Sequence, residues 1–418
     1  MSSPAIRLPS GVRDFLPRAA ARRRVLAENV LDVFEAWGYA RIITPMFECA
    51  DVLERGLGAG ARAAAIRFVE PGTGEVVALR PDITPQIARV VATRMADIPG
   101  PIRLCYEGAV SRLAGEAGQR EILQAGIELV DAPAPDGDAE VLAVAAAALA
   151  RVALPEIRID VGHVAPAAFV LGAAPDPAAR VLIANALARK DRAGVRSAAR
   201  ALPEGVGPLA EALATLWGPA PATLDRAVAL PWPAQVKAAL EQLRAVLAAF
   251  AALADSRAPQ VTIDLGDLRG FDYYTGVRFA AYAAGAPDAV LRGGRYDELL
   301  GRYGRAAQAT GFAIDLEAVA QAQRSIGIAA PVATCGVATH GPGAGELARA
   351  LRGAGLRAVT QARAPASWGA WLRGAGLDAA LVGDQLIGID DGTRSAGAAI
   401  EAARAGDTAP LIALLTTP

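Results

Sequence analysis

The segment Glu121–Asp131 reads EILQAGIELVD, and its apolar and polar residues alternate as they do in a β-strand with two unlike faces. One face would carry Leu123, Ala125, Ile127 and Leu129, and the other would carry Gln124, Gly126 and Glu128. Because glycine weakens a strand, one explanation of Gly126 is an open floor for a ligand between a carboxylate and an amide. The alternative is a sheet with one face in water, where both polar side chains are merely solvated.

Four further segments bring charged and polar side chains to helix starts, strand ends and turns. They are Leu79–Pro85 (LRPDITP), Tyr106–Arg112 (YEGAVSR), Asp267–Gly276 (DLRGFDYYTG) and the glycine-rich Leu291–Asp297 (LRGGRYD), which we interpret as a turn. Each has an ordinary explanation: helix caps, a surface arginine, tyrosines in a core or a dimer contact, a tight turn. Together they supply carboxylates, guanidinium groups, an amide and phenols, the set that a zwitterionic amino acid with a polar side chain requires.

The periodicity of apolar residues predicts the elements around these segments. The predicted helices are Arg22–Trp37, one that starts at Thr84-Pro85 with Thr84 as its cap, Ala139–Val152, Asp297–Tyr303 and one that ends near Arg324. The predicted strands are Tyr39–Thr44, Ile102–Val110, Ile122–Asp131, Val261–Leu265, Gly270–Tyr282 and Thr310–Ile314. From about Leu154 to Ala254 the chain is expected to be mostly helical. Beyond a linker at Ala329–Pro331, strands and helices alternate and predict a small α/β domain.

Length, charge and cysteine content restrict the class of protein. The 418 residues favour two or three domains, and 42 basic against 43 acidic residues give no basic face for a nucleic acid. The alanine-rich runs Val141–Ala150 and Ala239–Leu253 are too short or too interrupted by charge to cross a membrane. Met1–Ser10 shows no secretion signal, and three isolated cysteines fit a reducing cytoplasm. We therefore expect a cytoplasmic protein without a membrane or nucleic-acid partner.

No metal site or cofactor site is expected from the sequence. The two histidines, His163 and His340, lie far apart and have neither metal-ligand nor triad spacing, so we interpret both as structural. The three cysteines, Cys49, Cys105 and Cys335, do not form a cluster either.

In this order, the polar segments resemble the catalytic core of histidyl-tRNA synthetase, a class II aminoacyl-tRNA synthetase. Leu8–Pro17 (LPSGVRDFLP) and the helix–strand–Pro45 unit are similar to that family's start and dimer motif. LRPDITP resembles its histidine-loop motif, and Leu104–Arg112 with Gln124–Glu128 resembles its second class motif. LRGFDYYTG resembles its histidine-specific motif, and LRGGRYD with GFAIDLEAV resembles the third class motif. The resemblance covers about residues 7–324.

The resemblance implies an α+β fold, an antiparallel sheet flanked by helices. A class II synthetase-like core would span residues 1–328, with a helical insertion at about 154–254. Residues 332–418 would form a small α/β domain that resembles a degraded anticodon-binding domain. This C-terminal stretch has seven arginines, no lysine and seven acidic residues, so we expect a structural or partner-binding role there and not RNA binding.

The resemblance also implies a histidine site. Its residues would be Asp82, Thr84, Arg112, Gln124, Glu128, Arg269, Tyr273 and Tyr274. Asp82, Thr84 and Gln124 would hold the α-ammonium group, and Arg112 and Arg269 would lie near the carboxylate. Glu128 and Tyr274 would contact the imidazole nitrogens. Strict strand alternation would place Tyr273 on the face opposite Tyr274.

The chain departs from the synthetase pattern on the side that would hold ATP. Arg112 is followed by Leu113 and Ala114 where the family has a glutamate, and Ala318 replaces an arginine that grips phosphates. Asp82 also replaces the usual glutamate. Adenylation needs cations and donors directed at the charge that develops on phosphorus, and alanine supplies neither. The pattern therefore indicates a pocket that binds histidine and does not activate it.

This combination resembles the regulatory subunits of ATP phosphoribosyltransferase. The resemblance implies a non-catalytic chain that pairs with a short-form catalytic subunit in the first step of histidine biosynthesis. L-histidine would be its feedback effector, and self-association as a dimer is expected. Two alternatives stay open: an active histidine–tRNA ligase, and a dimeric scaffold with a vestigial pocket.

Overall fold

A computed structural model describes residues 7–113, 118–255, 257–268, 273–328 and 336–416. The chain folds as two compact units, Met1–Asp14 with Arg23–Ile328, and Phe15–Arg22 with Ala329–Pro418. No helix among the described residues combines the length and the apolar character needed to span a membrane.

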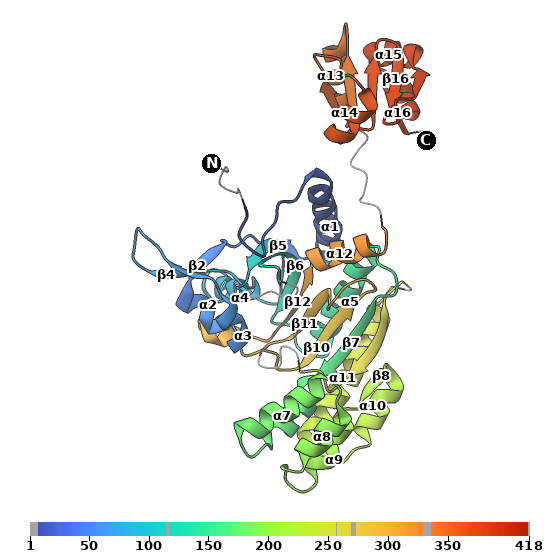
Figure 1. Ribbon diagram of the computed structural model, residues 1–418. Helices are drawn as coiled ribbons and strands as arrows, with labels where there is room; N and C mark the ends of the chain where they lie inside the picture. Colours follow the sequence, from blue (N-terminus) through green and yellow to red (C-terminus); the bar gives the residue numbers. More distant parts are fainter. Residues whose placement is uncertain (1–6, 114–117, 256, 269–272, 329–335, 417–418) are drawn as a thin grey trace, which may run out of the picture. The chain divides into compact units, whose positions relative to one another are not determined.

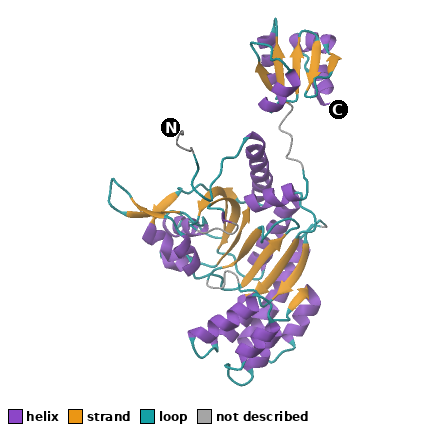
Figure 2. Ribbon diagram, in the orientation of Figure 1, coloured by secondary structure: helices purple, strands orange, loops and turns teal. Residues whose placement is uncertain are grey.

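The larger unit is organised around one mixed sheet (Figures 1 and 2). Its strands are β1 (Ala40–Arg41), β5 (Ile102–Ser111), β6 (Glu121–Val130), β7 (Arg158–His163), β8 (Trp217–Pro219), β9 (Gln260–Asp264), β10 (Val277–Tyr282), β11 (Leu291–Arg295) and β12 (Ala309–Asp315). They lie in the order β1-β5-β6-β12-β11-β10-β7-β9-β8. Neighbours are antiparallel except for the pairs β1–β5 and β7–β9, which are parallel. A predominantly antiparallel sheet is what the predicted fold class requires.

Helices and a small second sheet complete the larger unit. The helices outside the insertion are α1 (Pro17–Ala36), of which the part from Arg23 onward belongs to this unit, α2 (Ala50–Gly56), α3 (Ala59–Ala64), α4 (Thr84–Thr93), α5 (Asp136–Arg151) and α12 (Leu316–Ser325), with a 3-10 turn, η2 (Leu300–Tyr303). The small sheet has the order β2-β4-β3, formed by β2 (Phe47–Cys49), β3 (Arg67–Val69) and β4 (Val76–Leu79).

Strand β6 divides the interior into two sides, as its alternation predicts. Its odd-numbered residues, such as Ala125 and Ile127, are fully buried in the core that α1, α5 and α12 share. Its even-numbered residues lie on the face covered by α4, where Ile122 joins a second apolar cluster with Ile83 and Ile87. The candidate site lies on this second face.

A helical insertion connects two neighbouring parallel strands of the sheet. The chain leaves β7 at His163, runs through the insertion and returns in β9 beside β7. The insertion contains α6 (Val164–Gly172), α7 (Pro177–Ala188), α8 (Arg192–Ala199), α9 (Val206–Leu213), α10 (Ala220–Val228) and α11 (Ala234–Leu253), with strand β8 between α9 and α10. In Figure 1 the helices α7 to α10 gather at one end of the sheet, next to β8.

The smaller unit has an α/β fold of its own. It contains β13 (Gly336–His340), α13 (Ala344–Gly353), β14 (Arg357–Thr360), α14 (Trp368–Ala375), β15 (Ala379–Val382), β16 (Gln385–Gly388), β17 (Thr393–Ser395), α15 (Gly397–Arg404) and α16 (Ala409–Thr416). Its sheet has the order β14-β13-β15-β16-β17, with β13 parallel to both of its neighbours. The predicted alternation of strands and helices is confirmed up to β15, and the hairpin and two helices that follow were not predicted.

Several predicted elements are wrong in type or length. Strand β7 lies where helix was expected, because its Ile159 and Val161 pair with distant strands that no local pattern reveals. The segment LRGGRYD begins with strand β11 and not a turn: a side chain at Gly293 would meet Phe312 at 2.5 Å, so glycine permits close packing there. The predicted strand Tyr39–Thr44 is reduced to Ala40–Arg41, and the predicted helix Asp297–Tyr303 to the 3-10 turn Leu300–Tyr303.

A buried ion pair fixes the end of β11 against α5. The guanidinium of Arg295 lies 3.0 Å from both carboxylate oxygens of Asp138, and the two side chains are only 3% and 2% exposed. Arg295 also donates to the carbonyl of Ala132 (3.1 Å) and pairs with Asp297 (3.1 Å). Arg295 is followed directly by Tyr296, whose side chain lines a cavity of the larger unit. This ion pair therefore holds Tyr296 in place.

We predict that Asp138→Asn lowers the free energy of unfolding by about 3–5 kcal/mol, because it removes the buried carboxylate of the pair and leaves the Arg295 charge with only the partly exposed Asp297. Urea unfolding followed by circular dichroism measures this change. The control is Glu28→Gln in the exposed pair Arg24–Glu28, which should leave the free energy of unfolding almost unchanged because water screens this pair. Equal losses for the two variants would contradict the assignment of Arg295–Asp138 as a structural pair.

Candidate functional site

The predicted site residues converge on one cavity in the larger unit. The cavity has a volume of about 470 Å³. Seven of the eight predicted residues line it: Asp82, Thr84, Arg112, Gln124, Glu128, Tyr273 and Tyr274. The eighth, Arg269, lies outside the described residues. Side chains separated by up to 192 positions thus line one cavity.

The polar side chains of β6 are buried. Gln124 is 7% exposed and Glu128 is 2% exposed, and both line the cavity. The alternative in which these side chains are solvated at the surface is therefore wrong. Their neighbours on the other face, Ala125 and Ile127, belong to the main core, so β6 is buried on both sides.

Glu128 is a buried carboxyl group that lines the cavity. Neither of its carboxylate oxygens has a hydrogen-bond partner among the described residues. Burial raises the pKa of Glu128 well above its usual value; the nearby Thr84 hydroxyl opposes this effect and the Asp82 charge adds to it. A buried carboxyl group without a partner favours its neutral form until a cation or a basic nitrogen supplies the missing interaction.

Strand β12 shapes the space around Glu128, and it identifies a residue that the sequence analysis missed. Gly311 lies directly opposite Glu128 in the sheet. A side chain at Gly311 would lie 2.2 Å from Oε2 of Glu128 and 2.7 Å from the hydroxyl of Tyr296, so glycine leaves room for both groups. The Tyr296 hydroxyl is buried, lines the cavity and has no partner among the described residues.

The open floor expected above Gly126 is wrong. Tyr106 lies opposite Gly126 in the β5–β6 pair, and a side chain at Gly126 would meet the Tyr106 hydroxyl at 2.6 Å. Gly126 therefore accommodates a buried tyrosine beneath the cavity. The Tyr106 hydroxyl also lacks a partner among the described residues, and the pairing could have been found only from the register of the two strands.

Asp82 and Thr84 lie at the start of α4. The N-cap of the helix is Ile83 and Thr84 is its first residue, so Thr84 is not the cap. One oxygen of the Asp82 carboxylate, Oδ1, accepts the backbone N–H of Thr84 (3.3 Å) and its hydroxyl (3.4 Å). Arg112 also lines the cavity and donates through Nε to the carbonyl of Pro81 (3.0 Å), which orients its guanidinium group.

Both tyrosines of the DYYTG motif line the cavity. Strand β10 begins only at Val277, so the alternation that would separate Tyr273 from Tyr274 does not apply to them. Their rings meet edge to face with centroids 5.3 Å apart, and Tyr273 also packs against Tyr296 at 5.1 Å. The placement of Tyr273 on the opposite face is therefore wrong.

Two arginines line the cavity among the described residues, Arg112 and Arg292. Arg292 forms an ion pair with Asp288, so part of this positive charge is already neutralised. Ala318 is in the first turn of α12, where its backbone N–H donates to Asp315 (2.9 Å) and its side chain packs against the main core. The other substituted position, Ala114, lies outside the described residues.

Both histidines have structural surroundings. Burial lowers the pKa of His163 to about 4, and its neutral ring accepts the backbone N–H of Ala165 (3.1 Å) at the start of α6. The ring of His340 contacts the carbonyl of Gln361 (2.7 Å) in the smaller unit. Within the described ranges no group of three or more His, Cys, Asp or Glu side chains could hold a metal ion.

The cavity therefore combines three recognition elements for a small zwitterion. Asp82 and Gln124 offer oxygens to an ammonium group, and Arg112 offers a guanidinium to a carboxylate. Glu128 and Tyr296 offer a buried carboxyl and a buried hydroxyl to a polar side chain. An apolar ligand would leave these buried groups unpaired, so the cavity discriminates in favour of a ligand with matching polar atoms.

Comparisons with known proteins agree with this architecture. The sequence model of the Histidyl-tRNA synthetase family matches residues 11–319. A solved structure described as an ATP phosphoribosyltransferase regulatory subunit/histidyl-tRNA synthetase from Bacillus halodurans aligns with a TM-score of 0.78 at 26% identity, covering 91% of this chain and 99% of that one. The histidyl-tRNA synthetase of Nostoc sp. PCC 7120 has the same fold, with a TM-score of 0.77 at 21% identity over 96% of this chain and 100% of that one. The predicted class II synthetase-like fold is confirmed.

Curated relatives narrow the family further. The ATP phosphoribosyltransferase regulatory subunit of Anaeromyxobacter dehalogenans is 45% identical over 75% of this chain and 90% of its own length. The protein of the same name from Ralstonia nicotianae is 37% identical over 84% of this chain and 88% of its own length. The chain therefore belongs to the histidyl-tRNA synthetase family and, within it, to the ATP phosphoribosyltransferase regulatory subunits.

Proposed function

We propose that this chain is a non-catalytic regulatory subunit that binds free L-histidine and passes this signal to a short-form catalytic subunit of ATP phosphoribosyltransferase. The observation that supports it most is the buried Glu128 carboxyl group, which lacks a partner inside a cavity lined by the other predicted ligand residues. The imidazole of histidine can accept a proton from Glu128 or donate one to it, so it matches either protonation state.

The proposed contacts of histidine follow the arrangement of the cavity. Asp82, Thr84 and Gln124 would hold the α-ammonium group, with Arg112 and Arg269 near the carboxylate. Glu128, Tyr273 and Tyr274 would surround the imidazole, and Tyr296 joins them because its hydroxyl lies next to Glu128. Histidine bound here would favour one arrangement of the complex through its differential affinity for the two arrangements.

The two rival functions are less well supported. An active histidine–tRNA ligase needs unpaired cations for ATP, whereas Arg292 is neutralised by Asp288 and Ala318 is packed in the core. In a scaffold with a vestigial pocket we would not expect several buried polar groups without partners, since apolar replacements would make the protein more stable.

Self-association and a partner role of the smaller unit are part of the proposal. The small sheet β2-β4-β3 exposes apolar side chains, with Phe47 48% and Val69 60% exposed, and Ile43 nearby is 82% exposed. Exposed apolar side chains grouped in this way are typical of contact surfaces, so we assign this region to a dimer. We assign residues 332–418 a structural or partner-binding role, and we place the complex in the cytoplasm.

Glu128→Gln should weaken histidine binding by about 10- to 100-fold, because it removes a charged hydrogen bond worth roughly 1.5–3 kcal/mol. Isothermal titration calorimetry measures the affinity. The matched control is Glu121→Gln, an exposed glutamate on the same strand, which should bind histidine as the wild type does. Equal affinities for wild type and Glu128→Gln would show that the pocket is wrongly assigned.

The same substitution should stabilise the empty chain above about pH 4.5. Because the pKa of Glu128 is raised on folding, the folded chain binds more protons than the unfolded chain above the ordinary pKa. Stability therefore falls as pH rises from there toward the raised pKa, and glutamine removes this loss. Thermal melts from pH 4 to pH 8 should show a gain for Glu128→Gln that disappears at the acid end. A gain independent of pH would contradict the assignment.

Reconstitution with a short-form catalytic subunit tests the function as a whole. The two chains should co-elute in gel filtration, and the phosphoribosyl transfer by the complex should be inhibited by L-histidine. The complex that contains Glu128→Gln should need at least about ten times more histidine for half-inhibition. No co-elution, or inhibition that is the same with Glu128→Gln, would overturn the proposal.

The chain alone serves as the second arm of this test. Histidine-dependent exchange between pyrophosphate and ATP should be absent, since the cavity supplies too few free cations for adenylation. Exchange at a rate typical of synthetases would establish the ligase instead.

A further inference from the structure

Part of the cavity wall comes from a connection between strands and not from the sheet itself. Leu268, Tyr273 and Tyr274 line the cavity, and all three lie between the end of β9 at Asp264 and the start of β10 at Val277. We call the described residues of this connection, 265–268 and 273–276, the pocket connection. The positions of its side chains in the cavity depend on the contacts that hold its two ends.

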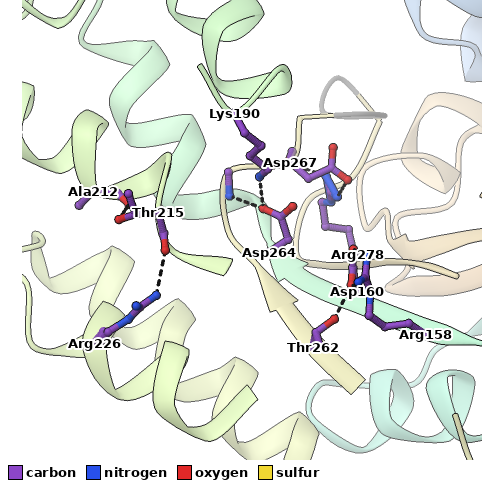
Figure 3. Close-up of polar contacts among 11 residues, drawn as sticks. Arg158, Asp160, Lys190, Ala212, Thr215, Arg226, Thr262, Asp264, Asp267 and Arg278 are labelled. Atoms are coloured by element: carbon purple, nitrogen blue, oxygen red, sulfur yellow. Dashed lines mark hydrogen bonds and ion pairs between the residues drawn. The ribbon is translucent and has the colours of Figure 1, made fainter. Parts of the chain in front are cut away.

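A buried ion pair links the two ends of the pocket connection. Arg278, on β10, is paired with the carboxylate of Asp267 and also donates to the Asp267 carbonyl (2.6 Å). The two side chains are 5% and 6% exposed. Figure 3 shows the side chains of Asp267 and Arg278 facing each other. A shift of the backbone at residues 264–267 is thus transmitted to the start of β10.

The end of the pocket connection that follows β9 is held by contacts with the helical insertion. Nζ of Lys190 lies 2.5 Å from Oδ1 of Asp264, and the same oxygen accepts the backbone N–H of Gly266 (3.0 Å) (Figure 3). The backbone N–H of Leu265 donates to the carbonyl of Leu216 (3.1 Å). A side chain at Gly266 would lie 2.6 Å from the Leu213 carbonyl, so the two backbones are in close contact.

Lys190 is held in an unfavourable backbone conformation. It lies in the turn between α7 and α8 with a φ of +54°, in the left-handed region that disfavours residues with a Cβ atom. Glycine or asparagine would suit this turn better. Side chains kept at such positions usually have a task that offsets the strain. Here the ammonium group reaches from the turn to Asp264, which is 12% exposed.

We propose that Lys190 is a positioning residue through which the helical insertion sets the conformation of the pocket connection. The contacts run from Lys190 to Asp264 and on to the backbone of Gly266, and the next residue, Asp267, is paired with Arg278 at the start of β10, the strand that Tyr273 and Tyr274 precede. Ligand occupancy and the position of the α7–α8 turn are then coupled, and linkage makes the coupling reciprocal. The identity of the ligand, L-histidine, rests on the proposed function.

The chain provides a matched control for this proposal. Lysine occurs at only two positions, 190 and 237, and both are in the helical insertion. Lys237 is exposed on α11. Lys190→Met removes the charge but keeps most of the aliphatic length, Lys190→Arg keeps the charge, and Lys237→Met repeats the first change away from the connection. Calorimetry with L-histidine, hydrogen–deuterium exchange and thermal melts are measured on the full chain for all three variants.

Lys190→Met should weaken histidine binding by roughly 3- to 10-fold, and Lys190→Arg should recover most of the loss. Without ligand, Lys190→Met should speed amide exchange in residues 264–268 and 273–278. In the wild type, histidine should slow exchange in residues 186–194, around the α7–α8 turn, and this response should vanish in Lys190→Met. Lys237→Met should behave as the wild type in every respect.

Two outcomes would overturn the role of Lys190. The first is unchanged exchange in residues 264–268 and 273–278 of ligand-free Lys190→Met. The second is a histidine affinity of Lys190→Met equal to that of Lys237→Met. A fall in affinity that simply parallels a fall in melting temperature, with no recovery in Lys190→Arg, also counts against it. Failure of the wild type to bind histidine would instead overturn the proposed function, and the ligand-free exchange would still decide the role of Lys190.

Discussion

The interior of this protein contains a carboxyl group, that of Glu128, whose two oxygens have no hydrogen-bond partner among the residues that the structure describes. Burial of Glu128 on β6 costs free energy in either protonation state, because an ionised carboxylate loses its water and a neutral one keeps unpaired donor and acceptor atoms. A fold keeps such a group when something outside the chain completes it. In the proposed function, the other cavity residues supply the remaining contacts to the ligand that completes Glu128.

The sheet is built to make that arrangement possible. Gly311 leaves room for the Glu128 carboxyl and the Tyr296 hydroxyl, and Gly126 leaves room for Tyr106 beneath them. The Arg295–Asp138 pair fixes the strand that precedes Tyr296. The remaining wall, which contains Tyr273 and Tyr274, is a connection held by Asp264 and Asp267. Strands therefore form one side of the cavity, and a segment tied to the helical insertion forms the other.

The sequence predicted which residues line the cavity better than it predicted the strands and helices around them. The alternation in Glu121–Asp131 placed Gln124 and Glu128 on one face because a strand with a single register leaves no other choice. Family resemblance then gathered residues that no local pattern could bring together, such as Asp82 and Tyr274. Strands β7 and β11 were missed because their stability comes from distant partners and not from local periodicity. Tyr296 and Tyr106 were missed because their roles depend on which glycine lies opposite or beside them, which only the register reveals.

The state of the Glu128 carboxyl group tests the central claim most directly. Infrared difference spectra of the wild-type chain during titration with L-histidine, with Glu128→Gln as the reference, report whether this group is protonated and whether a ligand contacts it. We expect a carboxylic acid band at neutral pH in the empty chain, absent from Glu128→Gln, that is lost or shifted as one histidine binds per chain. A spectrum that saturating histidine leaves unchanged would contradict the account.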